Sequence, residues 1–152
     1  MIIRQHRLAL LGLLAATGCG SSPSAPGAEP ERAAAVLVVD RDVVPLPSDA
    51  AEIVGARIAD ETLLLSLRHS GGCRTHRFAL HLVVPVPSSE TPILDLTLSH
   101  DAGGDACEAL LHPVLRIDLR PLRDVIAPRR SAALRLYRPG AAAPSVELPY
   151  RF

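Results

Sequence analysis

The residues able to do chemistry gather in one part of this 152-residue chain. Five of its six histidines and two of its three cysteines lie between residues 69 and 112. Most of them fall in two stretches, HSGGCRTHRF from His69 to Phe78 and SHDAGGDACE from Ser99 to Glu108. Thiols, imidazoles and carboxylates in such a group can form a disulfide, a metal site or an activated nucleophile.

The two cysteines of this region admit several hypotheses. We favour a Cys73–Cys107 disulfide, which would close a loop of about 35 residues and stabilise the fold by roughly 3.5–4 kcal/mol in the chain-entropy model. The first alternative is a zinc site that adds His76 and His100 to the two cysteines, because thiolates and imidazoles are common zinc ligands. In the second alternative, one of these histidines is the base for a reactive thiol and Asp101 orients it. Two free, inert thiols are the remaining possibility.

The loops around these residues carry weaker signals. Three carboxylates have the oxygen ligands that Ca²⁺ prefers, but their spacing matches no established calcium loop: Asp101, Asp105 and Glu108. Gly71-Gly72 and Gly103-Gly104 lead into no helix, so they are not phosphate-binding loops. We interpret both pairs as positions that need a positive φ. The other histidines of the region are expected to be ordinary surface or edge residues: His69, His81 and His112.

Segments with a two-residue period must position these groups. Alternation of apolar and mostly polar residues predicts half-buried strands at 63–68, 77–84, 94–99, 115–120, 134–137 and 146–152. Further strands are expected at about 34–39 and 53–58, and the only plausible helical turn is Pro121–Ala127. Short, evenly spaced strands without long helices predict an all-β domain, a small antiparallel β-sandwich of about seven or eight strands. Pro149 places the last strand at an edge, with Phe152 packed inward.

Chain direction places the two cysteines at one end of the sheet. If the strand before Cys73 runs up, the strand after it runs down and the next runs up again, so Cys107 also lies at the top. This holds whichever strands are neighbours. Parity adds that His76 shares a face with Phe78 and that His100 shares a face with Leu98, so both histidines are expected to point toward the core.

The N-terminus is typical of a secretory signal peptide. Arg4, His6 and Arg7 form a basic region, and Leu8–Ala16 is an apolar run too short to span a bilayer as a helix. Residues 1–18 are therefore predicted to be removed.

The residues that end this segment, Ala16-Thr17-Gly18-Cys19, resemble the lipobox of bacterial lipoproteins, with Ala16 where the family usually has Leu. The resemblance implies that Cys19 receives a diacylglyceryl group and becomes the acylated, palmitate-bearing N-terminus. An ordinary signal peptide, with Cys19 free for a disulfide, is the alternative. Gly20 follows the cysteine in place of an inner-membrane Asp, which favours the outer membrane.

Composition divides the rest of the chain. Residues 19–32 are the lipidated cysteine and a Ser, Pro and Gly-rich linker that cannot bury enough surface to order itself. Residues 33–152 are expected to form a single domain.

Composition also excludes several functions. All 16 basic residues are Arg and balance 16 acidic residues, so electrostatic binding of nucleic acid is not expected. The absence of Lys excludes Schiff-base chemistry and P-loops, and no G-x-S-x-G or H-E-x-x-H motif occurs. We therefore expect no enzymatic activity and no cofactor.

The two cysteine-containing stretches together are similar to sequences of uncharacterised secreted bacterial lipoproteins, some of them NigD-like. The similarity spans residues 70–122 and implies a secreted β domain without supplying an activity. It carries over, without established roles, only the following residues: Cys73, His76, His100, Asp101, Asp105 and Cys107. The sequence thus predicts an envelope lipoprotein whose partner is membrane lipid through Cys19 and whose domain is a non-enzymatic binding or structural module. The alternative is a zinc-binding protein that uses the Cys/His group.

Overall fold

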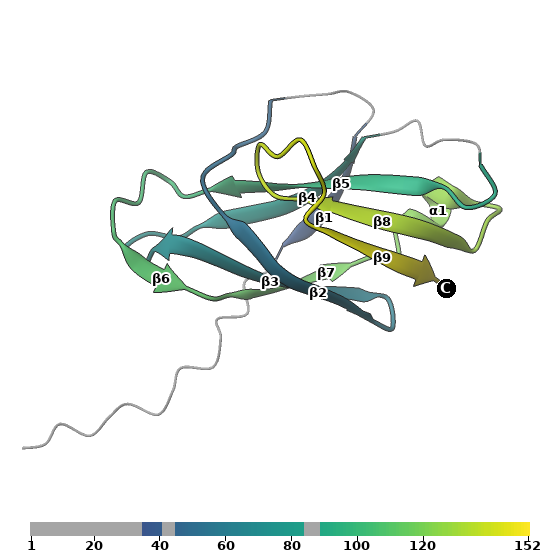
Figure 1. The fold of residues 1–152 in the computed structure, drawn as a ribbon, viewed down its shortest axis with the longest axis horizontal. Coiled ribbons are helices and arrows are strands. Elements are labelled where there is room, and N and C mark those ends of the chain that lie inside the picture. The colour runs from purple at the N-terminus through teal and green to yellow at the C-terminus, as the bar shows by residue number, and fades with distance from the viewer. Residues whose placement is uncertain (1–34, 41–44, 84–88) are drawn as a thin grey trace, which may run out of the picture.

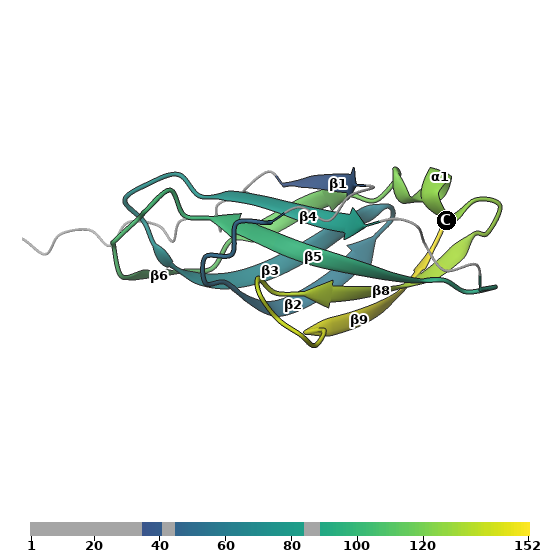
Figure 2. The same ribbon diagram turned by 90° about the horizontal axis from the view of Figure 1, so that it is seen from above.

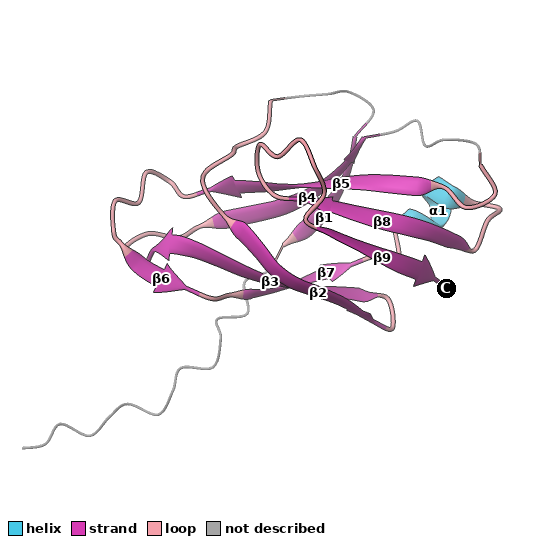
Figure 3. Ribbon diagram, in the orientation of Figure 1, coloured by secondary structure: helices cyan, strands magenta, loops and turns pink. Residues whose placement is uncertain are grey.

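The structure is a computed structural model and describes residues 35–40, 45–83 and 89–152. Two sheets pack face to face, and a short helix lies at one end (Figures 1 and 3). The prediction of an all-β sandwich is confirmed. The predicted signal peptide and linker, and the expected start of the domain at residue 33, lie outside the described residues.

Within the described residues the chain forms nine strands and one helix. The first five strands are β1 (Val36–Asp40), β2 (Glu52–Ala59), β3 (Thr62–Gly71), β4 (Arg77–Val83) and β5 (Ile93–Asp101). The remaining elements are β6 (Ala109–Leu111), β7 (Val114–Asp118), α1 (Leu122–Ile126), β8 (Ser131–Tyr137) and β9 (Val146–Arg151).

The alternation seen in the sequence is the alternation of burial. In β8, Ala132, Leu134 and Leu136 are buried, while the residues between them are half-buried. The same pattern in the other long strands gives a core that is mostly leucine, with Tyr150 as its largest side chain. Removal of these apolar faces from water holds the two sheets together.

The larger sheet has the strand order β1-β4-β5-β8-β9, and the smaller one places β2 and β7 on either side of β3. Two pairs, β1–β4 and β5–β8, are parallel, so the sandwich is less uniformly antiparallel than expected. Hydrophobic alternation specifies which face of a strand is buried, but it does not specify the neighbouring strand. β9 is an edge strand, as Pro149 predicted, and Phe152 packs against the core.

β6 is the strand that sequence reasoning missed. It has three residues, none of them buried, so it carries no alternating signal. It pairs with His69–Gly71 of β3, and β7 pairs with Thr62–Ser66 in the same antiparallel register. The carbonyl of Pro113 accepts a hydrogen bond from the N–H of Leu67 between these two stretches. β6 and β7 therefore act as one edge strand, interrupted at His112 and Pro113.

Two of the connections that cross between the sheets lie at the end of the sandwich where β6 lies, far from α1 (Figures 1 and 2). The β3–β4 connection leaves the smaller sheet for the larger one, and the β5–β6 connection returns. β3 and β4 are thus not neighbours in a meander, but the predicted shared end is correct. We call these two crossing connections, residues 72–76 and 102–108, the cap.

At the sides of the sandwich, β2 lies along β9 and β1 lies along β7. Among the described residues, no helix combines the length and the apolar character that a membrane-spanning segment requires.

The core predicts a sharp contrast between two leucines. Leu65 in the centre of β3 is fully buried, whereas Leu110 in β6 is 61% exposed. We expect Leu65→Ala to lower the free energy of unfolding by about 2–5 kcal/mol, because it leaves a cavity between the sheets. Leu110→Ala should change it by about 0.5 kcal/mol or less. Urea unfolding measures both, and equal effects would contradict this description of the core.

Candidate functional site

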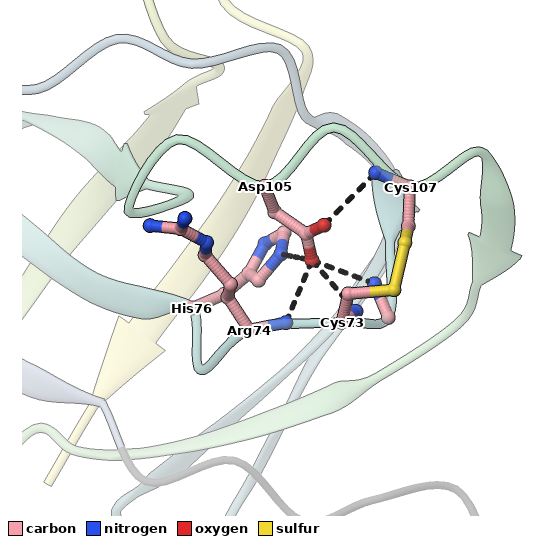
Figure 4. The surroundings of a disulfide bond; sticks show 6 residues. Cys73, Arg74, His76, Asp105 and Cys107 are labelled. Atoms are coloured by element: carbon pink, nitrogen blue, oxygen red, sulfur yellow. Dashed lines mark hydrogen bonds and ion pairs between the residues drawn. A yellow bond between two sulfur atoms is a disulfide. The ribbon is translucent and has the colours of Figure 1, made fainter.

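The cap is closed by a covalent bond. Cys73 and Cys107 form a disulfide with their Cα atoms 5.9 Å apart, so the favoured hypothesis for these cysteines is present in the structure. The bond joins the β3–β4 connection to the β5–β6 connection (Figure 4). Bridged sulfurs offer no thiolate, so in this form neither the Cys₂His₂ zinc site nor the thiol nucleophile can operate.

Asp105 is the centre of the polar contacts in the cap. Its Oδ2 accepts hydrogen bonds from the N–H groups of Gly72, Cys73 and Arg74 at 2.9–3.0 Å, and its Oδ1 accepts one from the N–H of Cys107 at 2.9 Å. Figure 4 shows the carboxylate between the two connections. Successive N–H groups aimed at one point form an anion-binding nest, and here the anion is a side chain of the protein itself.

These contacts fix the charge of Asp105. The side chain is fully buried, which by itself disfavours ionisation. The N–H of Cys107 is the largest of the influences that nevertheless hold the pKa of Asp105 far below its ordinary value, and the contacts with His76, Cys73 and Arg74 add to it. Asp105 is therefore a buried carboxylate that only accepts hydrogen bonds.

Asp105 also meets the histidines. Its Oδ2 lies 3.1 Å from Nε2 of His76, and Nδ1 of His76 lies 2.8 Å from Nε2 of His100. His76 is 6% exposed at its side chain and His100 is 1% exposed, so the predicted inward orientation of both is correct. Burial is the main reason that the pKa of His100 is lowered, and the neighbouring His69 and His76 add to the effect.

His69 corrects the expectation of an ordinary surface or edge residue. It is 6% exposed, and its ring centroid lies 4.6 Å from that of His76 and 5.0 Å from that of His100. The sequence held the signal, because His69 has the parity of the inward-facing Leu65 and Leu67. A ring nitrogen of each of these three histidines lies within 4.8 Å of the other two, which makes them a possible metal-binding group.

Two other carboxylates near the cap, Asp101 and Glu108, do not join this group. Asp101 accepts hydrogen bonds from the N–H of Gly103 and from Arg77, so it does not orient a catalytic histidine. Glu108 is exposed, and both oxygens of Asp105 are occupied by N–H donors. This arrangement gives no support to a calcium site. The glycines of both predicted pairs, Gly71-Gly72 and Gly103-Gly104, have positive φ, as predicted.

His81 of β4 makes a separate set of polar contacts with residues of β1 and β5. Nδ1 of His81 lies 3.3 Å from Asp40, and Nε2 lies 3.0 Å from Oγ of Ser99, which is the order of contacts in a Ser-His-Asp triad. Ser99, however, is 6% exposed in the paired centre of β5, and its hydroxyl donates to the carbonyl of Ala79. A nucleophile must be presented to its substrate, so we assign these contacts a structural role.

The opposite end of the molecule has an open hollow of about 500 Å³ beside α1. Its lining is polar and rich in arginine: Arg123, Asp124, Arg129, Arg130 and Phe152 among others. Arg123 is paired with Glu61 at 2.6 Å and lies over the ring of Phe152. His112 is exposed and lies apart from the cap histidines, as expected.

Comparison with known proteins finds matches in structure alone: no protein-family model and no curated protein matches the chain. A NigD-like immunity protein from Bacteroides caccae ATCC 43185 has a similar fold, with a TM-score of 0.55 and 18% identity over 78% of this chain and 64% of that one. A protein from Bacteroides fragilis NCTC 9343 described as a putative lipoprotein has a TM-score of 0.51 and 10% identity, over 77% of this chain and 69% of that one.

The chain therefore spans less than two thirds of the length of the first of these proteins. Identities this low establish a shared fold and nothing about activity. The likeness to NigD-like proteins that residues 70–122 suggested is thus matched at the level of the fold.

Gly71 is the position on which the histidine contacts depend most directly. A Cβ at Gly71, where φ is 143°, would lie 2.5 Å from Nε2 of His76. We expect Gly71→Ala to destabilise the fold by about 1–3 kcal/mol from backbone strain, and by more because the His76 ring must move. Gly140→Ala is the matched control, since Gly140 also has positive φ but open space around it. Equal unfolding midpoints in the two variants would contradict this.

Asp105 predicts a loss of stability in acid. The pKa of Asp105 is lower in the folded chain than the value of about 3.9 expected for the unfolded chain. Asp105 therefore adds to the free energy of unfolding above about pH 3.9, and this stabilisation is lost as the pH falls toward the folded pKa. Because burial lowers the pKa of His100 in the folded chain, the free energy of unfolding also falls as the pH drops below about 6.5, the value for an unfolded histidine.

Asp105→Asn should be less stable than the parent at pH 7 and should lose less stability between about pH 5 and pH 3. Urea unfolding of chelator-treated protein across this range measures the effect. Glu90→Gln, at an exposed loop position, is the control and should follow the parent. A parent-like pH profile for Asp105→Asn would show that the carboxylate does not carry this dependence.

Proposed function

We propose that this protein is a lipoprotein of a bacterial cell envelope, attached to the outer membrane through an acylated Cys19. In this proposal residues 20–32 are the tether, and the sandwich is a non-enzymatic binding or structural module held away from the bilayer. Several acyl chains give stable attachment where a single chain does not.

The disulfide of the cap is the observation that carries the proposal. Disulfides persist outside the reducing cytosol, so a domain with Cys73 bonded to Cys107 suits an exported protein. The pairing also leaves Cys19 as the third cysteine of the chain, free for acylation. The fold shared with a Bacteroides fragilis protein described as a lipoprotein gives further support.

The form of the domain supports a binding or structural role over catalysis. Each buried side-chain nitrogen or oxygen of the described residues has a polar neighbour within hydrogen-bond distance, and the serine beside His81 is covered. Sandwich domains commonly bind partners through loops that are positioned by the packed sheets, and this domain has the same form.

Cys19→Ala should release the protein from the membrane fraction, because the residue that carries the lipid is gone. Cell fractionation followed by mass spectrometry of the N-terminal peptide measures this: the parent should show an acylated cysteine, and the variant an uncleaved or unacylated chain. Replacing both Cys73 and Cys107 with Ser is the matched control for loss of a cysteine, and it should leave attachment unchanged.

Gly20→Asp tests the choice of membrane. In an enterobacterial host we expect this variant to move to the inner-membrane fraction in a density gradient, while the parent stays with the outer membrane. A soluble parent protein with a free amine at another residue would overturn the lipoprotein proposal. A parent protein in the inner membrane would overturn only its outer-membrane part.

A further inference from the structure

Three imidazole rings from three elements meet beneath the cap. His69 comes from β3, His76 directly precedes β4, and His100 comes from β5. The Phe78 ring stacks on His100 with a centroid distance of 4.5 Å, so the group is shielded on that side by an apolar ring. Two sheets and both crossing connections thus bring these histidines to one buried place.

In each of the three rings, one nitrogen lies against an oxygen that can only accept a hydrogen bond. Nε2 of His76 faces Asp105, whose carboxylate is surrounded by N–H donors. Nδ1 of His100 lies 3.2 Å from the carbonyl oxygen of Asp49, and Nδ1 of His69 lies 2.9 Å from that of Ser70. Each of these three ring nitrogens must therefore be the one that carries the proton.

This assignment leaves a lone pair on the other nitrogen of each neutral ring: Nε2 of His69, Nδ1 of His76 and Nε2 of His100. Nδ1 of His76 and Nε2 of His100 face each other at 2.8 Å. Two lone pairs at that distance repel unless a positive charge lies between them. The buried polar network is thus complete only when it holds a cation.

The geometry points to a metal site: we propose that His69, His76 and His100 bind one divalent transition-metal ion of the zinc class, with their outward nitrogens oriented by Ser70, Asp105 and Asp49. Imidazole is a preferred ligand of such ions, and three protein ligands leave a fourth position open. Ligating histidines characteristically donate their other N–H to a carboxylate or a backbone carbonyl, which is the pattern of all three rings here.

The distances suit such an ion. Ligand nitrogens lie about 2.0–2.1 Å from zinc, so two ligands of one ion are at most about 4.2 Å apart. The His76–His100 pair already meets this limit, and the three-histidine group lies within 4.8 Å. Two ligand nitrogens of a tetrahedral zinc ion lie about 3.3 Å apart, so binding would move His76 and His100 slightly apart and bring His69 closer to them. The bridged cysteines take no part, which distinguishes this site from the Cys₂His₂ set that the sequence offered as an alternative.

The test uses the full chain, exported with its disulfide intact, purified in detergent and stripped of metal with a chelator. Calorimetric titration with ZnCl₂, followed by elemental analysis after gel filtration, should give one zinc per chain. His76→Gln and His100→Gln should weaken binding by about a hundredfold or more, since loss of a second-shell partner alone costs about 10–100-fold. His69→Gln should also weaken it, and the exposed His112→Gln should bind like the parent.

A second measurement uses the unsubstituted chain and so does not depend on whether the variants fold. Long-range ¹H–¹⁵N spectra should show the proton on Nε2 of His76 and on Nδ1 of His69 and His100, and zinc should shift the three opposite nitrogens. Zinc that binds no more tightly to the parent than to His76→Gln would overturn the proposal. So would an imidazolium proton shared by His76 and His100 that zinc fails to displace.

Discussion

The buried carboxylate of Asp105 is the contact on which the arrangement of the cap depends. It collects four backbone N–H groups and one imidazole from two chain segments that are distant in the sequence. A buried charge is tolerated only with such compensation, so the segments that supply the donors must stay where they are. The disulfide acts on the same two connections, and together a covalent bond and an ionic centre fix the end of the sandwich.

The fold makes this end the natural place for a polar site. Elsewhere in the described residues the two sheets meet mostly through leucine side chains, with the Tyr150 hydroxyl bonded to the carbonyl of Leu119. Where the chain crosses from one sheet to the other, the ladder of strand hydrogen bonds stops and N–H groups become free to face a ligand. Gly71 allows the closest approach, because its missing Cβ leaves room for the ring of His76.

Much of this could be predicted because strand alternation is written residue by residue. The positions of eight strands, the edge location of β9, the shared end of Cys73 and Cys107, and the inward direction of His76 and His100 all follow from parity and chain direction. His69 obeys the same parity, but a histidine at the end of a strand is commonly exposed, so the sequence predicts a surface position that the structure corrects. The contacts of Asp105 could not be predicted, since they depend on loop dihedral angles that leave no periodic pattern.

The disulfide also changes what happens to the chain when it is cut. Cys73 and Cys107 enclose β4 and β5, two adjoining inner strands of the larger sheet, in a covalent ring. A protease that cleaves the exposed residues Ser89 or Glu90, between these strands, therefore leaves both products joined by the sulfur bond and by the strand ladder. Such a nicked chain keeps its core and its cap, so a single cut between β4 and β5 does not separate the domain into two pieces.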